Sequence, residues 1–155
     1  MPVVKLKEFL DQNRVKYVSL RHSTAYTAQE IAASAHVKGR NMAKTVVVKV
    51  GDRYTMLVLC ASCRVVMSRV EELLGGPATM ATERELEELF PDGEVGAEPP
   101  FGSQYGMKTY ADATLKGVDE IVFRAGSHDQ SIKMKLAAYE KVEKPTWGSF
   151  AIEQF

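Results

Sequence analysis

The spacing of apolar residues along the chain predicts a fold in which helices and strands are interspersed. Apolar residues between positions 3 and 10 recur at helical spacing, and a β-type run follows at positions 15–20. Two further apolar, β-branched segments, at 45–50 and 54–60, are separated by Gly51-Asp52-Arg53. Because glycine permits a tight turn, these two segments predict a β-hairpin.

Three helices are predicted to begin at a Thr or Ser that precedes a glutamate by three positions. The pairs are Thr27 with Glu30, Ser68 with Glu71, and Thr82 with Glu85. In each pair the hydroxyl can accept from a free helix N–H while the carboxylate accepts from the N–H of the capping residue. The second of these helices should end at residues 75–77, Gly-Gly-Pro, because glycine adopts the left-handed stop conformation and proline cannot continue a helix.

The second half of the chain carries three more strand patterns, at residues 106–111, 120–124 and 131–135. A closing helix is predicted at 136–143, before Pro145. Residues 147–155 are more aromatic than a free tail, so we expect them to pack either on the body of the protein or against another subunit.

The composition is that of a globular protein with one core. The chain has 155 residues, of which 45% are hydrophobic and 26% charged, with no repeat or linker segment. Residues 1–155 are therefore expected to form a single α/β domain, with a mixed β-sheet or a partly closed barrel surrounded by helices. The charged N-terminal segment does not resemble a signal peptide and no apolar run reaches the length of a membrane span, so we expect a cytoplasmic location and no membrane partner.

Three segments could carry chemistry, and each also has an ordinary structural explanation. Lys44 precedes the strand pattern at 45–50, so its ammonium could enter a cleft, although surface lysines are more common. The loop at 94–102 has glycines on both sides of a proline pair and could hold a ligand through its backbone, or it could simply connect two elements. Residues 126–129, Gly-Ser-His-Asp, follow a predicted strand, where α/β proteins often form sites, but a solvated turn has the same composition.

The common hydrolase and nucleotide-binding motifs are absent from the sequence. It contains no G-x-S-x-G elbow, no H-E-x-x-H helix and no phosphate-binding P-loop. A hydrolytic function would therefore use a positioned water. Cys60 and Cys63 form a lone C-x-x-C, which predicts reduced core thiols; a metal site with His22 or His128, or a redox pair, is the alternative.

Four segments together resemble one known family. They are HSTAYTAQE at residues 22–30, GRNMAKT at 39–45, GAEPPFG at 96–102 and GSH at 126–128. In their order and spacing they resemble the YbaK family, which includes the editing domain of bacterial prolyl-tRNA synthetase, and the resemblance extends from about residue 5 to residue 144. It implies a freestanding aminoacyl-tRNA deacylase with a mixed α/β fold and without a metal or organic cofactor.

The resemblance also assigns roles to particular residues. It implies three catalytic residues, Lys44, Gly96 and His128. Lys44 would hold the terminal phosphate or orient the tRNA 3′ end, the backbone of the loop that begins at Gly96 would clamp the ribose and the aminoacyl group, and His128 would position water or recognise the aminoacyl group. The residues implied in substrate binding are His22, Tyr26, Pro100, Phe101, Gly102 and Ser127.

The expected reaction is attack of water on the aminoacyl ester, assisted by the neighbouring ribose hydroxyl. The expected partners are the acceptor end of an aminoacyl-tRNA, in particular tRNA(Pro), and prolyl-tRNA synthetase, with the protein a monomer or a homodimer. Twenty basic residues balance twenty acidic ones, so contact with RNA must be local, and Lys38, Arg40 and Lys44 are expected to form a small basic cluster near the site.

Two other functions remain open at this point. A chain of this fold could be a non-catalytic module that binds tRNA or a synthetase, because a fold does not fix a function. A thiol or metal protein built on Cys60 and Cys63 is the third possibility. The amino acid removed cannot be deduced from the residues, and the preference for a small one such as alanine or cysteine rests on the resemblance.

Overall fold

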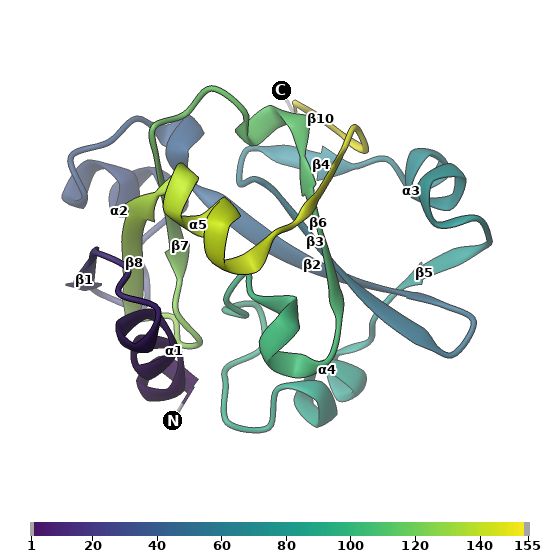
Figure 1. Ribbon diagram of the computed structural model, residues 1–155, viewed down its shortest axis with the longest axis horizontal. Helices are drawn as coiled ribbons and strands as arrows, with labels where there is room; N and C mark the ends of the chain where they lie inside the picture. The colour runs from purple at the N-terminus through teal and green to yellow at the C-terminus, as the bar shows by residue number, and fades with distance from the viewer. Residues whose placement is uncertain (1, 154–155) are drawn as a thin grey trace.

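The computed structural model describes residues 2–153 (Figure 1). The helices are α1 (Pro2–Gln12), α2 (Ala28–Ser34), α3 (Met67–Leu74), α4 (Glu83–Leu89) and α5 (Leu136–Glu143), with short 3-10 turns η1 (Gly39–Asn41), η2 (Gly102–Tyr105) and η3 (Ala113–Leu115). The strands are β1 (Tyr17–Arg21), β2 (Ala43–Val50), β3 (Arg53–Cys60), β4 (Cys63–Val65), β5 (Ala78–Met80), β6 (Lys108–Asp112), β7 (Glu120–Arg124), β8 (Gln130–Lys135), β9 (Thr146–Gly148) and β10 (Ala151–Glu153).

The largest sheet is built on the predicted hairpin. Its strand order is β5-β2-β3-β6-β9, in which β5, β2 and β3 are antiparallel, while β6 and β9 run parallel to β3. Val50 pairs with Arg53 across the turn, and Gly51 adopts a positive φ of 60°, a conformation that glycine takes without steric cost. The hairpin is confirmed, with the turn one residue shorter than expected.

A second, antiparallel sheet has the order β1-β8-β7, and β4 pairs separately with β10. The two larger sheets meet at a parallel bridge between Met42, just before β2, and Val122 in β7. The mixed α/β architecture is thus confirmed, whereas the strand ladders among residues 2–153 do not close into a barrel.

The sheets enclose two groups of buried side chains. The larger group lies between the sheets, α1 and α5, and α5 crosses in front of the strands in Figure 1. The smaller group packs α2 onto the bridge between the sheets. It consists of Ile31 and Ala32 on the helix, Ala35 at its C-cap, and the bridge residues Met42 and Val122. Because successive strand residues face opposite sides, β7 supplies both groups: Val122 belongs to the smaller one, and Ile121 and Phe123 belong to the larger one.

The first and third predicted capping boxes are confirmed, and the second is wrong. The Thr27 and Thr82 hydroxyls each accept from the N–H of the glutamate three residues later. The carboxylate of that glutamate in turn accepts from the backbone N–H of the threonine. Helix α3 instead begins after Val66, so Ser68 lies inside its first turn, and the Glu71 carboxylate accepts from the Ala78 N–H at the start of β5. The Val66 N–H donates to the Phe150 carbonyl, a tertiary contact at the capping residue of α3, which lies two residues before the one that the local pattern predicts.

Several predicted boundaries move by a few residues. The early strand covers 17–21 instead of 15–20, and the strand expected at 106–111 begins at Lys108 because Gly106, with φ of 72°, ends η2. The aromatic tail packs on the body: β9 pairs with β6, and β10 pairs with β4, as far as residue 153. The buried Asp112 carboxylate supports this arrangement by accepting from the Phe150 and Ala151 N–H groups.

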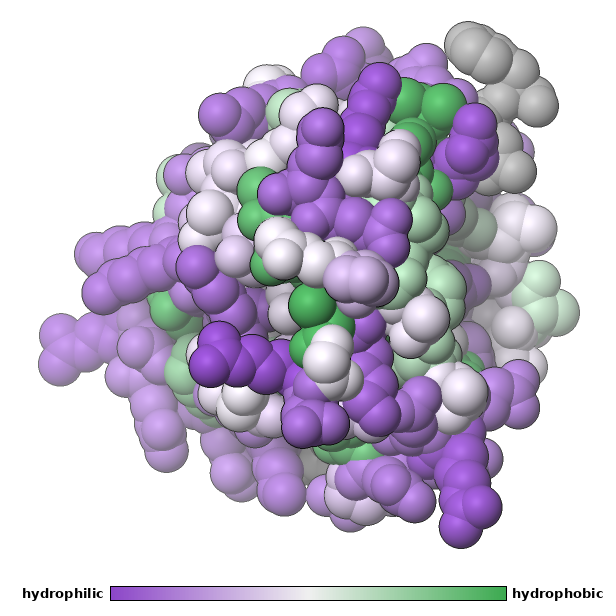
Figure 2. Space-filling view, turned by 90° about the vertical axis from the view of Figure 1, so that its right-hand side faces the viewer, coloured by the Kyte–Doolittle hydropathy of each residue, from purple (hydrophilic) through white to green (hydrophobic). Residues whose placement is uncertain are grey.

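The end of the molecule that carries α3, β5 and the hairpin turn is mostly hydrophilic. Figure 2 shows this face, where hydrophobic residues form only small separate areas among charged and polar ones. Within residues 2–153, none of the helices combines the length and the apolar character needed to cross a membrane.

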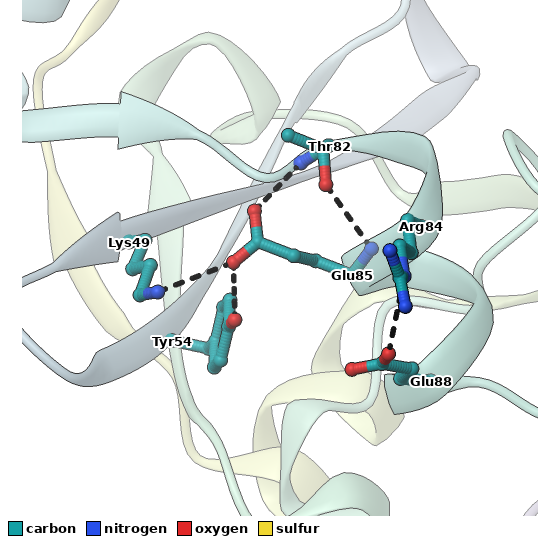
Figure 3. A network of polar contacts seen from close by, with 6 residues as sticks. All are labelled: Lys49, Tyr54, Thr82, Arg84, Glu85 and Glu88. Carbon is teal, nitrogen blue, oxygen red and sulfur yellow. Dashed lines mark hydrogen bonds and ion pairs between the residues drawn. The ribbon is translucent and has the colours of Figure 1, made fainter.

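A polar network at this end joins α4 to the hairpin (Figure 3). Besides closing the capping box with Thr82, the Glu85 carboxylate accepts from the Tyr54 hydroxyl and lies 3.3 Å from the Lys49 ammonium. The Thr82 N–H, followed by Tyr54 and Lys49, lowers the pKa of Glu85 from 4.5 to about 2. The network therefore favours the charged form of Glu85 in the folded protein.

We expect the stabilisation from Glu85 to disappear in acid. Because the folded-state pKa lies below the unfolded-state value, the contribution is complete above about pH 5 and is lost as the pH falls from about 4.5 towards 2. The difference in free energy of unfolding between the native protein and Glu85→Gln, measured by urea titration, should therefore be constant above about pH 5 and shrink below it. Glu87→Gln, an exposed position on the same helix, is the control; a Glu85→Gln difference that stays constant down to pH 2.5 would contradict this assignment.

Candidate functional site

The two loops that the sequence singled out are hydrogen-bonded to each other. The Glu94 N–H donates to the Gly126 carbonyl at 2.9 Å, and the Gly126 N–H donates to the Ala97 carbonyl at 2.8 Å. The His128 ring adds a third link, from Nε2 to the Val95 carbonyl at 2.8 Å. Residues that lie as far as 33 positions apart in the chain thus form one structural unit.

Gly96 makes this contact possible by having no side chain. A Cβ at this position would lie 3.4 Å from His128 Cε1, and the backbone φ of 89° is one that other residues rarely adopt. The Gly96 N–H donates to the Glu98 carboxylate at 3.0 Å, so it is already engaged and is not a free donor for a ligand. Gly96 therefore allows the two loops to approach closely, and it does not offer its N–H to a ligand.

The hydrogen bond to Val95 defines which His128 nitrogen carries a proton. A carbonyl oxygen only accepts, so Nε2 must be the protonated nitrogen and, in the neutral ring, Nδ1 keeps its lone pair. The side chain is half-buried. His128 is thus a held imidazole with one basic nitrogen left over, which is the state a general base requires.

His22 is bound differently, and both of its ring nitrogens are engaged. Nδ1 lies 3.0 Å from the Ser23 carbonyl and must donate to it, so Nε2 accepts from the buried Ser131 hydroxyl at 2.8 Å. The ring stacks on Tyr26 with centroids 5.6 Å apart and an interplanar angle of 10°. Because neither ring nitrogen is free, His22 can offer a substrate the surface of its stacked ring but not a proton acceptor.

The segment that holds His22 and Tyr26 is tied to β7 and to the β7–β8 turn. The His22 N–H donates to the Asp129 carbonyl at 2.9 Å, and the Tyr26 carbonyl accepts from Arg124 Nη2 at 3.1 Å. Within the same turn, the Ser127 hydroxyl donates to the Asp129 carboxylate at 2.8 Å. Ser127 therefore fixes the turn that presents His128.

Lys44 is the second residue of β2 and pairs with Leu59, so it lies within the strand rather than before it. Side chains two residues apart share a face of a strand, so Lys44 follows Met42 on the α2 side, as Arg124 follows Val122 in the neighbouring β7. Lys44 is half-buried and takes part in none of the ion pairs formed among residues 2–153. The parallel bridge thus brings two cations, Lys44 and Arg124, to the side of the sheet where Tyr26 lies.

The sequence did not identify Arg124 as a site residue. It ends an apolar strand, Glu120–Arg124, and its Nε is buried without a hydrogen-bond partner among the described residues. The sequence feature that could have identified Arg124 is its position as a cation at the end of an otherwise apolar strand. The other two members of the expected basic cluster, Lys38 and Arg40, line a separate depression with residues 117–119, and Lys44 does not line it.

Two residues predicted to bind substrate belong to the core. Phe101 is fully buried, and its ring lies 5.2 Å from Tyr139 and 5.6 Å from Phe123, centroid to centroid. Gly102 is buried as well, and a Cβ there would meet the Thr109 hydroxyl at 2.5 Å. The side chain of Phe101 is therefore unavailable to a ligand, because the aromatic core takes up all of its surface.

Helix α5 holds the proline-rich loop from behind. The Tyr139 hydroxyl donates to the buried Pro100 carbonyl at 2.6 Å, and burial raises the pKa of Tyr139, which keeps the hydroxyl protonated. One turn later, the buried Glu143 carboxylate accepts from the Ser103 hydroxyl and the Thr109 hydroxyl, both at 2.5 Å. The loop that reaches Gly96 is thus fixed at its far end by two buried polar contacts.

A depression lies beside this loop, away from the candidate catalytic residues. It has a volume of about 390 Å³ and is lined by residues of α1, α4 and the loop, among them Phe90, Pro99 and Tyr105. Lys44, Gly96 and His128 do not line it.

The two cysteines are reduced thiols in the core, as the first of their three explanations predicted. Cys60 and Cys63 are free thiols in the core, and burial, followed by the proximity of Cys60, raises the pKa of Cys63. Among residues 2–153, His, Cys, Asp and Glu side chains do not come together in any group of three that could hold a metal ion. The two thiols pack the core beside β3 and β4.

A family model for the aminoacyl-tRNA editing domain matches residues 22–142. The chain belongs to this family. The matched range contains all nine residues predicted for the site, from His22 to His128.

Sequence relatives of this editing domain include the Multifunctional Ser/Thr-tRNA deacylase ProXp-y of Escherichia coli K12 and its counterpart in strain O157:H7. Each is 34% identical over 102 residues, which cover 64% of this chain. The chain spans 60% of the length of these relatives.

Structural relatives share the fold over nearly the whole chain. A protein described as a candidate trans-editing enzyme for prolyl-tRNA synthetase superposes with a TM-score of 0.85 at 20% identity, covering 99% of this chain and 98% of the other. A scaffold protein used for epitope backbone grafting also matches, with a TM-score of 0.85 at 17% identity over 99% of this chain and 98% of its own. At these identities the likeness concerns the fold alone.

We expect Tyr139→Phe to loosen the loop of this editing domain. Removing the hydroxyl leaves the buried Pro100 carbonyl without its donor, which should destabilise the protein by about 1–3 kcal/mol. Hydrogen exchange should show weaker protection of the Gly126 N–H, which depends on the position of Ala97. Tyr110→Phe, on β6, is the matched control; equal protection in the native and Tyr139→Phe proteins would show that α5 does not position the loop.

Proposed function

We propose that this editing domain hydrolyses the ester between tRNA and a small, mischarged amino acid. The observation that carries the proposal is the contact between the two matched loops, in which His128 is held through Nε2 and keeps a basic Nδ1. A domain that only bound tRNA would have no need for a positioned imidazole. The family to which the chain belongs supports the same reaction class.

In the proposed reaction, water attacks the aminoacyl ester carbonyl. His128 Nδ1 accepts a proton from that water, and the ester bond breaks with the electron pair and a proton going to the ribose oxygen. The vicinal ribose hydroxyl of the substrate assists by hydrogen bonding at the same centre. Lys44 supplies a positive charge that orients the 3′ end through its terminal phosphate, since an ammonium on a flexible stem suits a phosphate as a point charge.

Tyr26 and His22 form the wall against which the aminoacyl group or the terminal base rests in this proposal. Their stacked rings present a flat surface, and the hydrogen bond from Arg124 to the Tyr26 carbonyl fixes its position. Pro100, Phe101 and Gly102 act through the backbone shape that their burial imposes. The reaction needs no metal or organic cofactor.

The substrates in the proposal follow from the relatives. The Escherichia coli relative is named as a Ser/Thr-tRNA deacylase, so serine and threonine join alanine and cysteine as candidates for the removed amino acid. The structural relative is described in connection with prolyl-tRNA synthetase, which favours tRNA(Pro) and that synthetase as partners. The cytoplasmic location expected from the sequence is part of the same proposal.

The first test measures release of amino acid from a panel of mischarged tRNAs. We expect Lys44→Ala and His128→Ala to lower kcat/KM by roughly 10²-fold or more, because each removes a charge or proton acceptor that acts in the transition state. Lys108→Ala and His36→Asn are controls; His36 has a φ of 59°, which asparagine tolerates. If the native protein releases no amino acid from any panel member, the domain is a binding module instead.

A conservative variant separates the two functions of His128. Glutamine can still donate an N–H to the Val95 carbonyl but has no basic nitrogen. His128→Gln should therefore be as inactive as His128→Ala while it melts at the native temperature. Recovery of activity in His128→Gln would limit the residue to holding the loop.

A further inference from the structure

A basic groove lies where the end of α1 and the start of β1 meet α5. It has a volume of about 500 Å³, and its cations are Arg14, Lys16, Lys135, Lys141 and Lys144. No acidic residue lines it, and its remaining lining is aliphatic apart from Asn13. A quarter of the twenty basic residues of an electrically neutral chain thus line one groove.

The cations of the basic groove are not neutralised by the protein. All five are exposed, and none takes part in the ion pairs found among residues 2–153. Glu143, the acidic residue next to Lys144, is turned away, since its carboxylate is buried against Ser103 and Thr109. Unpaired cations gathered in one groove repel each other, so the folded protein alone gains nothing from this arrangement.

The backbone gives a second, independent indication. Arg14 and Lys144 adopt positive φ values of 57° and 53°, and His36 is the only other non-glycine residue among the described ones to do so. Each follows a helix: the Val15 N–H bonds to the Leu10 carbonyl around Arg14, and Lys144 caps α5. This left-handed position is normally taken by glycine, because a Cβ there is strained.

The helix dipole does not explain why Lys144 carries a cation. In α5, Lys141 already supplies a positive charge in the last turn, so the dipole does not require Lys144. Helix α1 has no basic residue in its last turn, so at Arg14 the backbone strain is the only indication of a function. A long cation at the strained position costs stability that glycine would not. Strain kept at a site points to a function for the side chain.

The basic groove lies at the far end of the β1–β8 ladder from His128. Strand β8 begins at Gln130, two residues after His128, and ends at Lys135 in the groove, with β1 alongside it (Figure 1). The six extended residues of β8 span roughly 20 Å. Measured along the helix axis of B-form DNA, that distance covers about six phosphates of one strand, so a nucleic-acid duplex can extend from His128 to the groove.

We infer that the basic groove binds the phosphate backbone of the tRNA acceptor stem while the aminoacyl end lies at His128. This inference depends on the proposed function, because that function places the 3′ end of the tRNA at His128. Family membership does not imply it, because Arg14, Lys16 and Lys144 lie outside the matched residues 22–142. Binding through phosphates is independent of sequence, weakens with salt and suits exposed Lys and Arg side chains.

The test uses uncharged tRNA, so it does not depend on hydrolysis. The affinity of the full-length protein is measured by fluorescence anisotropy at several salt concentrations. Arg14→Gly/Lys144→Gly should weaken binding about tenfold and reduce the slope of log K against log salt by roughly 0.7–0.9 for each lost contact. Its Tm should be unchanged or higher, because glycine relieves the left-handed strain at both positions.

Two further variants keep the inference open to refutation. Lys16→Gln/Lys141→Gln removes two charges of the groove without altering the backbone and should weaken binding in the same way. Arg53→Gln/Arg69→Gln removes two exposed charges from the hairpin and α3, and it should bind tRNA like the native protein. Equal weakening in this control, or native affinity and salt slope in both groove variants, would overturn the inference.

Hydrolysis assays then separate this inference from the proposed function. The groove variants should raise KM for full-length aminoacyl-tRNA and leave kcat unchanged, and they should match the native protein on an aminoacyl ester of a short CCA oligonucleotide. If no substrate is hydrolysed but the groove variants still lose tRNA binding, the groove stands and the deacylase proposal fails. Tighter binding of the native protein to anionic lipid vesicles than to tRNA would assign the groove to a different anionic surface and overturn the inference.

Discussion

The candidate site depends on a buried polar anchor between α5 and the proline-rich loop. A carboxylate and a hydroxyl taken from water are costly unless their hydrogen bonds are satisfied, so Glu143 and Tyr139 hold the loop in one place. The Phe101 ring packs edge-to-face against Tyr139 in the core. With one end of the loop fixed, its other end can meet the β7–β8 turn in a defined geometry.

The parallel bridge between Met42 and Val122 is the second constraint on the site. It sets two strands from different sheets side by side, and the alternation of their side chains then brings Lys44 and Arg124 to the face covered by α2. The hairpin delivers the lysine and the neighbouring antiparallel sheet delivers the turn with His128. The candidate site therefore lies where the two sheets join.

The electrostatic organisation of the protein follows from a chain with no net charge. Acidic residues gather on α4, where Glu85 serves the hairpin, and cations gather at the end of α1 and α5. A protein with a net charge of zero can still have a strongly positive groove. Attraction to phosphates depends on the charges within about a Debye length, roughly 10 Å at moderate salt. A domain that handles one end of an RNA needs only this local field.

Local patterns in the sequence determined the hairpin, the capping boxes of α2 and α4, the closing helix and the mixed α/β class, because each depends on residues close together in the chain. The family resemblance determined which loops would form the site. Only the tertiary structure decided that α3 begins at a contact with Phe150, that Phe101 belongs to the core, and that His22 and His128 differ in their free nitrogens. It also brought Arg14 and Lys144, the first and last members of the basic groove, together from opposite ends of the chain. These features depend on contacts between residues far apart in sequence, which no local pattern encodes.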